Sequence, residues 1–266
     1  MKTSLTSRDL KKIIILNKKE GQTPLEALEV FRAKNKAYKD TKLTYAGRLD
    51  PTASGLLLVL AGDETKNKEK YLALDKEYEF EILFGFATDT YDILGKVVKS
   101  GPVAENLEKN IKQNLKFFTG KFVQKYPMYS SKTVNGKQLF EYARAGEEVE
   151  VPEREVNVKK LQFVKLRKIT SKKLLENIEK RIKKVKGDFR QKEILKIWQK
   201  NLKNYQGFTL IIGKFEVKCS SGTYVRSIAN SLGEKLGIPA LAFSIKRTKI
   251  GVWKKDTKSS KQTTKS

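Results

Sequence analysis

The sequence predicts an α+β layer structure with a basic helical hairpin insertion, because its strand and helix signals are mixed without a regular βαβ order. A strand is predicted over residues 78–86, where large apolar side chains largely occupy alternate positions. A helix is predicted after Thr23, since Pro24 takes the first helical position and Glu26 stands three residues after the cap. This irregular order favours an α+β fold over a doubly wound parallel sheet.

The remaining elements follow from apolar spacing and from glycines at their ends. A buried strand is expected over residues 56–61, the longest apolar run of the chain. The later predictions are a helix over 102–118, a short helix over 137–144 stopped by Gly146, a strand over 208–219, a turn over 220–222 and a helix over 224–236 ended by Gly237.

Residues 165–206 form a strongly basic segment, with 15 Lys or Arg against 4 Asp or Glu and a net charge of +11. Apolar side chains recur at helical spacing over 174–185 and again over 194–202. Gly187 is expected to close the first helix, and Asp188 with Gln191 to cap the second. The hairpin has two interpretations, a solvated surface insertion with a packed apolar seam or an arm that faces nucleic acid.

Composition excludes several kinds of chemistry. The 266 residues carry a formal charge of +26, which indicates a polyanionic partner such as nucleic acid or an acidic membrane surface. The chain has no histidine, and its one cysteine, Cys219, is expected to be a small buried residue. Histidine bases, disulfides and cysteine-based zinc sites are therefore excluded. The chain shows no signal peptide and no apolar run long enough to span a membrane, so a cytoplasmic protein is expected.

The most informative segment, residues 46–58, is predicted to be a tight loop that leads into a buried strand. Asp50 and Pro51 suit the first two positions of a turn, and Gly47 and Gly55 permit backbone angles that other residues resist. Asp50 is either an ordinary turn residue or a carboxylate nucleophile presented by a rigid strand.

A family resemblance favours the nucleophile. Residues 47–50 (Gly-Arg-Leu-Asp) followed by 53–57 (Ala-Ser-Gly-Leu-Leu) resemble the catalytic motif of pseudouridine synthases. Residues 76–80 and 85–92 are similar to the second motif of the TruB family, the tRNA pseudouridine-55 synthases. The other matching segments, in the family's order, are 124–132 with 135–137 and 142–146, then 219–226, and finally 245–251.

The resemblance implies one pseudouridine synthase-like catalytic domain over residues 1–253, built on a mixed, largely antiparallel central sheet with flanking helices. Within it, residues 124–152 would form an RNA-contacting insertion and residues 165–206 the basic helical insertion. The Lys-rich tail over 254–266 is expected to be disordered. No separate C-terminal RNA-binding domain is expected.

The resemblance also implies roles for individual side chains. Asp50 would be the nucleophile, attacking C1′ of the ribose or C6 of the base. Tyr78 would stack on the target base and assist removal of the C5 proton. Arg226 would pair with Asp50 and keep it ionised. Ile245 would form an apolar wall of the site.

Five further positions are expected to bind substrate. Lys66 matches a lysine near the site, and Tyr45 stands where the family often has a histidine that contacts RNA. Tyr129, Lys132 and Arg144 belong to the RNA-contacting insertion. Two nearby carboxylates outside this set, at positions 89 and 92, are expected to be structural.

The implied reaction is isomerisation of the uridine at position 55, in the T loop of tRNA, to pseudouridine. It needs no cofactor and no metal. The expected partner is the T arm of tRNA, the expected state is a monomer, and the composition fits a bacterial source. Two alternatives remain: a pseudouridine synthase that acts on another RNA, and a catalytically silent RNA-binding or tRNA-folding factor.

Overall fold

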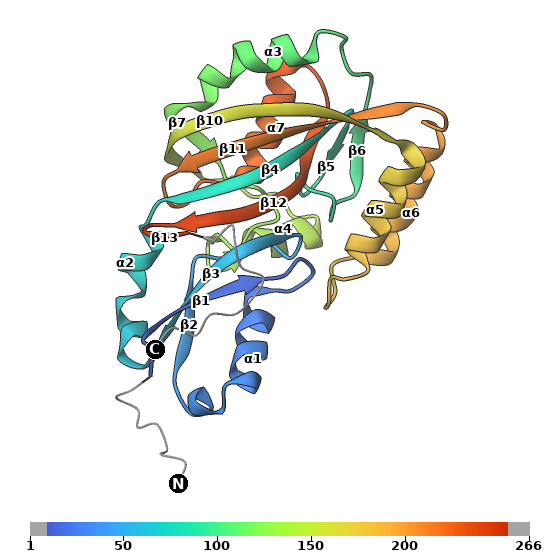
Figure 1. Cartoon of the computed structure of the whole chain (residues 1–266). Coiled ribbons are helices and arrows are strands. Elements are labelled where there is room, and N and C mark those ends of the chain that lie inside the picture. Colours follow the sequence, from blue (N-terminus) through green and yellow to red (C-terminus); the bar gives the residue numbers. More distant parts are fainter. Residues whose placement is uncertain (1–9, 255–266) are drawn as a thin grey trace.

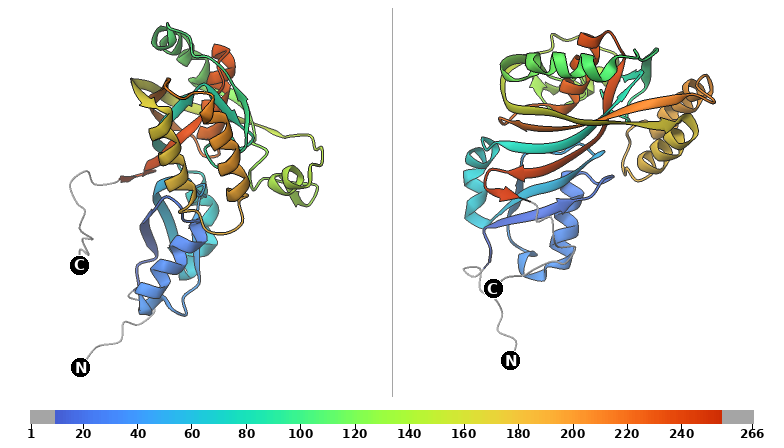
Figure 2. Two further views of the ribbon diagram at one scale, coloured as in Figure 1. Left: turned by 90° about the vertical axis from the view of Figure 1, so that its right-hand side faces the viewer. Right: turned by 45° about the horizontal axis from the view of Figure 1, so that its top comes forward.

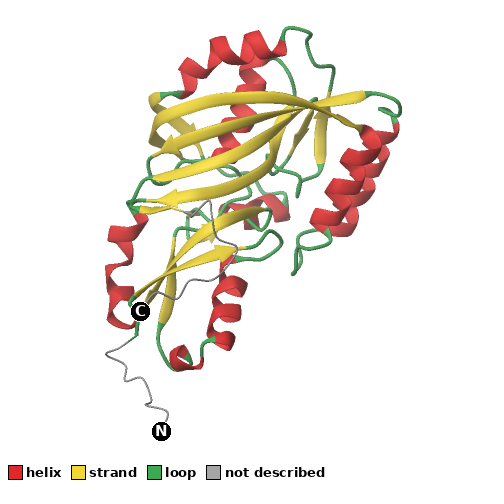
Figure 3. Ribbon diagram, viewed as in Figure 1, coloured by secondary structure: helices red, strands yellow, loops and turns green. Residues whose placement is uncertain are grey.

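The computed structural model describes residues 10–254, and within them it confirms the α+β class with a nine-stranded central sheet (Figures 1 and 3). The main path of the sheet runs β1-β3-β12-β4-β11-β10-β7, with β2 paired to β3 and β13 to β12. All pairs are antiparallel except β12 with β3. These strands are β1 Ile13–Lys18, β2 Leu43–Ala46, β3 Ala53–Ala61, β4 Lys76–Phe84, β7 Gly120–Lys125, β10 Glu153–Thr170, β11 Thr209–Cys219, β12 Ala240–Ile250 and β13 Trp253–Lys254.

Helices cover both faces of this sheet. On one face, α3 and α7 share a core with alternate residues of β4 such as Phe80 and Ile82. On the other face, Leu83 packs into the core formed by α5 and α6. The period-two pattern of β4 therefore fills two separate cores. The helices are α1 Pro24–Lys34, α2 Lys68–Leu72, α3 Leu107–Asn114, α4 Leu139–Ala145, α5 Ser171–Ile182, α6 Gln191–Lys203 and α7 Val225–Leu236.

Short elements complete the described chain. The 3₁₀ helices are η1 Lys36–Tyr38, η2 Gly62–Asn67 and η3 Leu115–Phe118, and the two small sheets pair β5 Phe86–Thr88 with β6 Val97–Ser100 and β8 Thr133–Val134 with β9 Lys137–Gln138.

Three predicted helix ends are confirmed, but Gly187 does not close α5, which ends at Ile182 with Lys183 as its C-cap. Thr23 accepts a hydrogen bond from the Glu26 amide at 3.1 Å, and the Thr23 amide donates to the Glu26 carboxylate at 2.6 Å. Gly146 and Gly237 end α4 and α7 in the left-handed conformation. The helix predicted over 102–118 begins later than expected, at the first residue of α3, and its last turn is the 3₁₀ helix η3.

The 18-residue strand β10 was not predicted. Most of its side chains are charged or exposed, and two register shifts interrupt the alternation, between Val158 and Lys160 and between Phe163 and Lys165. A strand with bulges and one solvated face has no clear period-two apolar signal. Residues 165–170, assigned to the helical insertion from sequence, are the end of this strand.

The helical hairpin α5–α6 is confirmed, and it is part of the fold rather than an appendage (Figure 2). Its apolar stripes join the second core, where the fully buried Trp198 donates from its indole to the Ile93 carbonyl at 3.2 Å. The predicted cap of α6 is wrong: its N-cap is Arg190 at φ +62°, while Asp188 accepts from the Arg190 amide. Gln191 instead donates to the Gly187 carbonyl at 2.7 Å and closes the loop.

The structure bears on the predictions about the C-terminal tail and about membrane spans only for residues 10–254. Of the tail over 254–266, Lys254 belongs to β13 and pairs with Lys249 of β12, and the rest lies outside the described residues. Among residues 10–254, no helix has the length and apolar character needed to cross a membrane.

Candidate active site

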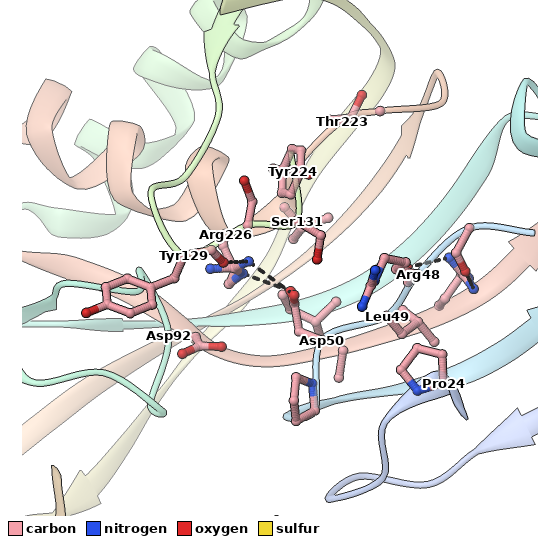
Figure 4. Close-up of a pocket in the computed structure, with 18 of the residues that line it drawn as sticks. Pro24, Arg48, Leu49, Asp50, Asp92, Tyr129, Ser131, Thr223, Tyr224 and Arg226 are labelled. Atoms are coloured by element: carbon pink, nitrogen blue, oxygen red, sulfur yellow. Dashed lines mark hydrogen bonds and ion pairs between the residues drawn. The ribbon is translucent and has the colours of Figure 1, made fainter. Parts of the chain in front are cut away.

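A pocket of about 720 Å³ opens where several segments meet (Figure 4). It is lined by the loop before β3, by β4, by the start of α7, by the loop over 89–94, by the 124–152 insertion and by the tip of the α5–α6 hairpin. Six of the nine predicted site residues line it: Asp50, Tyr78, Tyr129, Arg144, Arg226 and Ile245. The fold therefore gathers residues that are up to 195 positions apart in sequence.

Asp50 lies in a tight turn before β3, as predicted. Its carbonyl accepts from the Ala53 amide at 3.0 Å, which closes the turn around Pro51. Two positions further along β3 from Ala53, Gly55 has φ +110°, and a Cβ there would collide with the Arg247 carbonyl oxygen of β12. Gly55 is thus required for the close approach of β12 to β3, which supports the loop.

Arg226 holds the Asp50 carboxylate with two parallel hydrogen bonds. Its Nε donates to Asp50 Oδ2 at 2.8 Å and its Nη2 to Oδ1 at 3.1 Å. The Arg226 side chain is 4% exposed, whereas that of Asp50 is 35% exposed. The guanidinium is therefore buried behind the carboxylate, and the carboxylate faces the pocket. This fork geometry fixes the orientation of the Asp50 carboxylate.

Two backbone carbonyls complete the set of acceptors around Arg226. Thr90 accepts from Nη1 at 2.6 Å and Tyr129 from Nη2 at 3.1 Å. Burial disfavours the charged form of Arg226, but the carboxylates of Asp50 and Asp92 outweigh it, so the pKa of the guanidinium is raised. Arg226 consequently stays charged and fixed between these partners.

Asp92 is a buried carboxylate behind the pair, consistent with the structural role expected for it (Figure 4). It accepts from Thr52 Oγ1 at 2.9 Å, from Thr90 Oγ1 at 2.7 Å and from the Leu94 amide at 2.9 Å. Burial raises its pKa, and the charge of Arg226 opposes that rise. Because Thr52 belongs to the turn of Asp50, Asp92 joins that turn to the loop that holds Arg226.

Arg247 is a second buried arginine, to which sequence reasoning assigned no role. It is 1% exposed and donates to three carbonyls of the Asp50 loop and β3: Leu56 at 2.7 Å, Gly47 at 3.2 Å and Arg48 at 3.3 Å. Within residues 10–254, no carboxylate forms an ion pair with it. The sequence placed Arg247 within the family motif over 245–251 but did not indicate its role. The structure shows that it anchors the Asp50 loop.

Tyr78 and Ile245 form walls of the pocket, as expected. Tyr78 lies opposite Arg247 in the β4–β12 register, and Ile245 lies opposite Phe80 in the same pair. Burial raises the pKa of Tyr78, and the nearby Arg247 charge opposes this rise. The Tyr78 hydroxyl therefore stays protonated at neutral pH, which favours a stacking role over a role as free phenolate base.

Of the three predicted RNA-contacting residues in the insertion, Tyr129 and Arg144 line the pocket and Lys132 does not. Tyr129 contributes its carbonyl to Arg226, and its ring lies 4.4 Å from the Arg190 guanidinium. Arg144 donates to the Asp188 carbonyl at 2.6 Å, so it contacts the hairpin tip. Lys132 does not line the pocket; it is exposed, with its ammonium 5.6 Å from the Tyr126 ring.

Lys66 was expected near the site, but it is not among the residues that line the pocket. Lys66 lies in the exposed helix η2 and pairs with Asp63 at 2.9 Å. Glu69 and Leu72 of the following helix α2, three and six residues further along the chain, do line the pocket.

Tyr45 also does not line the pocket. It sits in β2, where its side chain packs against the cluster of Ala27, Leu28, Leu57 and Val59 between α1 and the sheet. The Tyr45 ring packs against this cluster because α1 covers its face of β2.

Two buried lysines near the pocket were not singled out from sequence. Lys18 is 1% exposed and donates to the Gln22 carbonyl at 2.6 Å, while Lys76 is 5% exposed and donates to the Leu72 carbonyl at 2.6 Å. Burial lowers the pKa of each to about 8. The apolar pattern of a strand does not show that a lysine within it is buried. The burial of Lys18 and Lys76 is seen only in the three-dimensional structure.

A carboxylate held by a buried guanidinium and open to a pocket is suited to nucleophilic chemistry. The family model described as TruB family pseudouridylate synthase, N-terminal domain, matches residues 34–187. The chain belongs to this family.

Curated relatives agree with this assignment. The tRNA pseudouridine synthase B of Caldanaerobacter subterraneus subsp. tengcongensis is 35% identical over 88% of this chain and 67% of its own length. The proteins of the same name from Ligilactobacillus salivarius and Streptococcus thermophilus are 34% and 36% identical, over 90% and 89% of this chain and 67% of their own lengths. The chain thus spans about two thirds of the length of these relatives.

Solved structures share the fold at lower identity. A chain of a Cbf5-Nop10-Gar1 complex matches with a TM-score of 0.55 and 21% identity, over 92% of this chain and 50% of that chain. A chain of an H/ACA RNP bound to a substrate RNA containing 2'-deoxyuridine matches with a TM-score of 0.52 and 20% identity, over 92% and 49%. The chain spans about half the length of these proteins.

Proposed function

We propose that this protein isomerises the uridine at position 55, in the T loop of tRNA, to pseudouridine, with Asp50 as the nucleophile. The observation that carries the proposal is the Arg226–Asp50 pair, in which the guanidinium is buried and the carboxylate opens to the pocket. Membership of the TruB family supplies the reaction, and the name of the relatives supplies tRNA as the substrate.

The pair suits the chemistry of the isomerisation. The N1–C1′ bond of uridine breaks, a C5–C1′ bond forms, the C5 proton leaves and N1 gains a proton, so the reaction is balanced without a second substrate. The Asp50 carboxylate can add to C1′ or to C6, which detaches or activates the uracil for rotation. Its two hydrogen bonds to Arg226 hold it in place for either attack, so no reorganisation is needed when it reacts.

The pocket suits an extruded base. A uridine inside a folded RNA loop must be flipped out to reach the carboxylate. Tyr78 provides a flat face for stacking and Ile245 an apolar wall, and both line the same pocket as Asp50. These contacts hold the uracil while its bond to the ribose is broken.

RNA is proposed to be bound by the insertion and by the hairpin. Tyr129 and Arg144 line the pocket at the entrance formed by the insertion, and Lys132 is exposed beside it. The hairpin carries exposed lysines on both helices, which suit phosphate contacts that do not depend on sequence. Binding of the T arm would rest on its shape. A monomer that acts in the cytoplasm, where tRNA is found, without cofactor or metal, belongs to the same proposal.

The test uses an unmodified tRNA transcript and the purified protein. Pseudouridine is mapped by chemical adduct formation and primer extension, with Asp50→Asn as the matched control. The proposal predicts a new stop in the T loop with the wild type and none with Asp50→Asn. Tight binding without any stop would favour the silent RNA-binding factor, and a stop only on ribosomal RNA would favour the other substrate.

A further inference from the structure

The tip of the α5–α6 hairpin is a wall of the catalytic pocket. Phe189 and Arg190, at the end of the loop between the two helices, line the same pocket as Asp50. The loop lies at the lower end of the hairpin in Figure 1. A segment inserted between β10 and β11 therefore reaches a site built by other parts of the chain.

Arg190 makes two contacts there. Its Nη1 donates to Asp89 Oδ2 at 2.9 Å, and its guanidinium lies over the Tyr129 ring at 4.4 Å. The two side chains of the ion pair are 19% and 21% exposed, so the contact is largely shielded from solvent. A guanidinium that is both paired with a carboxylate and stacked on an aromatic ring is held in one orientation.

The two partners of Arg190 belong to the segments that hold Arg226. Tyr129 offers its carbonyl to Arg226 Nη2 at 3.1 Å. Thr90, the neighbour of Asp89, offers its carbonyl to Arg226 Nη1 at 2.6 Å. One side chain of the hairpin thus fixes both loops whose carbonyls orient the partner of Asp50.

The tip is itself firmly held. Arg144 of α4 donates to the Asp188 carbonyl at 2.6 Å, and Arg181 of α5 pairs with Glu20 in the loop after β1. Arg190 has φ +62°, a conformation that is unfavourable for residues other than glycine. Such backbone strain persists where surrounding contacts over-determine it.

We propose that Arg190 is a positioning residue for the isomerisation, which fixes Arg226, and through it Asp50, by clamping Tyr129 and Asp89. The inference rests on the proposed function. It is distinct from phosphate binding by the hairpin, because the Arg190 guanidinium is already engaged and mostly buried. The exposed lysines nearby, such as Lys192, are the groups suited to phosphate.

The test compares Arg190→Met with Lys109→Met, which removes an exposed charge on α3, away from the residues that line the pocket. Rates of pseudouridine formation are measured in single turnover at saturating enzyme, and affinity for tRNA is measured separately. Arg190→Met is expected to slow the reaction by about 10- to 100-fold, because small misplacements of a catalytic group are costly. The affinity of Arg190→Met for tRNA should change by less than about twofold, and Lys109→Met should leave the rate unchanged.

Two further variants separate positioning from folding. Arg190→Gly suits the left-handed backbone but lacks the guanidinium, so it should be as slow as Arg190→Met. A double variant with Asp89→Asn should be little slower than either single variant, because the two side chains act as a unit.

Three results would overturn the inference. Weaker binding at an unchanged rate would make Arg190 an RNA contact. A normal rate for Arg190→Gly would show that only the backbone of the tip matters. Unchanged kinetics in every Arg190 variant, with an active wild type, would end the positioning role while leaving the proposed function intact. A wild type that forms no pseudouridine on any RNA would instead overturn the proposed function and this inference with it.

Discussion

The floor of the pocket and the outer face of the α5–α6 hairpin carry positive charge in opposite settings. On the floor, Arg226 and Arg247 are 3% and 1% exposed, and each donates to fixed acceptors at 2.6–3.3 Å. On α6, Lys192, Lys196 and Lys200 are exposed at intervals of four residues, and within residues 10–254 none of them forms an ion pair. The positively charged side chains are therefore held in fixed positions on the pocket floor and exposed to solvent on α6.

This difference separates two tasks. A buried guanidinium with defined partners controls geometry, which catalysis needs. Solvated lysines follow a phosphate backbone without fixed geometry, and they contribute affinity that falls with salt. Substitutions on the floor should therefore change the rate of the chemical step, and substitutions on the outer face should change binding.

The largest effect is expected for Asp50→Asn. The amide keeps the shape of the carboxylate but is not a nucleophile, so the rate should fall by about 10⁴-fold or more. Affinity for tRNA should stay within about threefold, because Asp50 contributes no phosphate contact. Single-turnover kinetics and a binding titration check both parts, and a rate within tenfold of the wild type would remove Asp50 from the chemistry.

Arg226→Met should affect both rate and stability. The loss of an oriented donor costs about 10²- to 10³-fold in rate. It also leaves the buried Asp92 without its counter-charge. The free energy of unfolding should fall by about 3 kcal/mol, at the lower end of the range for broken buried pairs because Asp50 is partly solvated. Denaturant unfolding measures this loss, and a variant of wild-type stability would contradict the buried pairing.

Lys76→Met tests the buried lysines through pH. The pKa of Lys76 is lowered to about 8, so below pH 8 the folded state bears the full cost of a buried charge. Between about pH 8 and 10.5 the folded state loses its proton first, so this residue makes the free energy of unfolding rise with pH. The rise should be about 3 kcal/mol and should be missing in Lys76→Met. Parallel unfolding curves for the two proteins across this range would contradict the assignment.

The smallest effect on rate is expected on the outer face of α6. Replacing Lys192, Lys196 and Lys200 by Gln should leave the single-turnover rate within about twofold. The slope of log affinity against log salt should become shallower by about 0.7–0.9 for each phosphate that is no longer bound. Replacement of the same three lysines by Arg keeps the charge and serves as control. An unchanged slope in the Gln variant would assign the hairpin a purely structural role.

The sequence predicted the parts of the site that depend on short-range order. The turn at Asp50, the cap at Thr23 and the left-handed end at Gly146 are local, so residue chemistry was sufficient. The resemblance to the family predicted that Arg226 pairs with Asp50, which the spacing of the two residues in the sequence does not indicate.

What could not be predicted depends on contacts between distant segments. Tyr45 does not line the pocket because α1 covers its face of the sheet, and Lys66 pairs with Asp63 within η2 instead of lining the pocket. Arg247 and Arg190 gain their roles only from the carbonyls and rings that the fold places beside them. A basic or aromatic residue has no signature in sequence that distinguishes an anchor from a surface group.

The separation of chemistry from binding is tested most directly by one paired measurement on the same tRNA. Single-turnover rates at saturating enzyme and dissociation constants over a range of salt are determined for the wild type, for Asp50→Asn and for the α6 variant with three Gln. The account predicts that Asp50→Asn loses the rate and keeps the affinity, while the α6 variant keeps the rate and loses part of the affinity and salt dependence. An Asp50→Asn protein that still forms pseudouridine at the wild-type rate would contradict it.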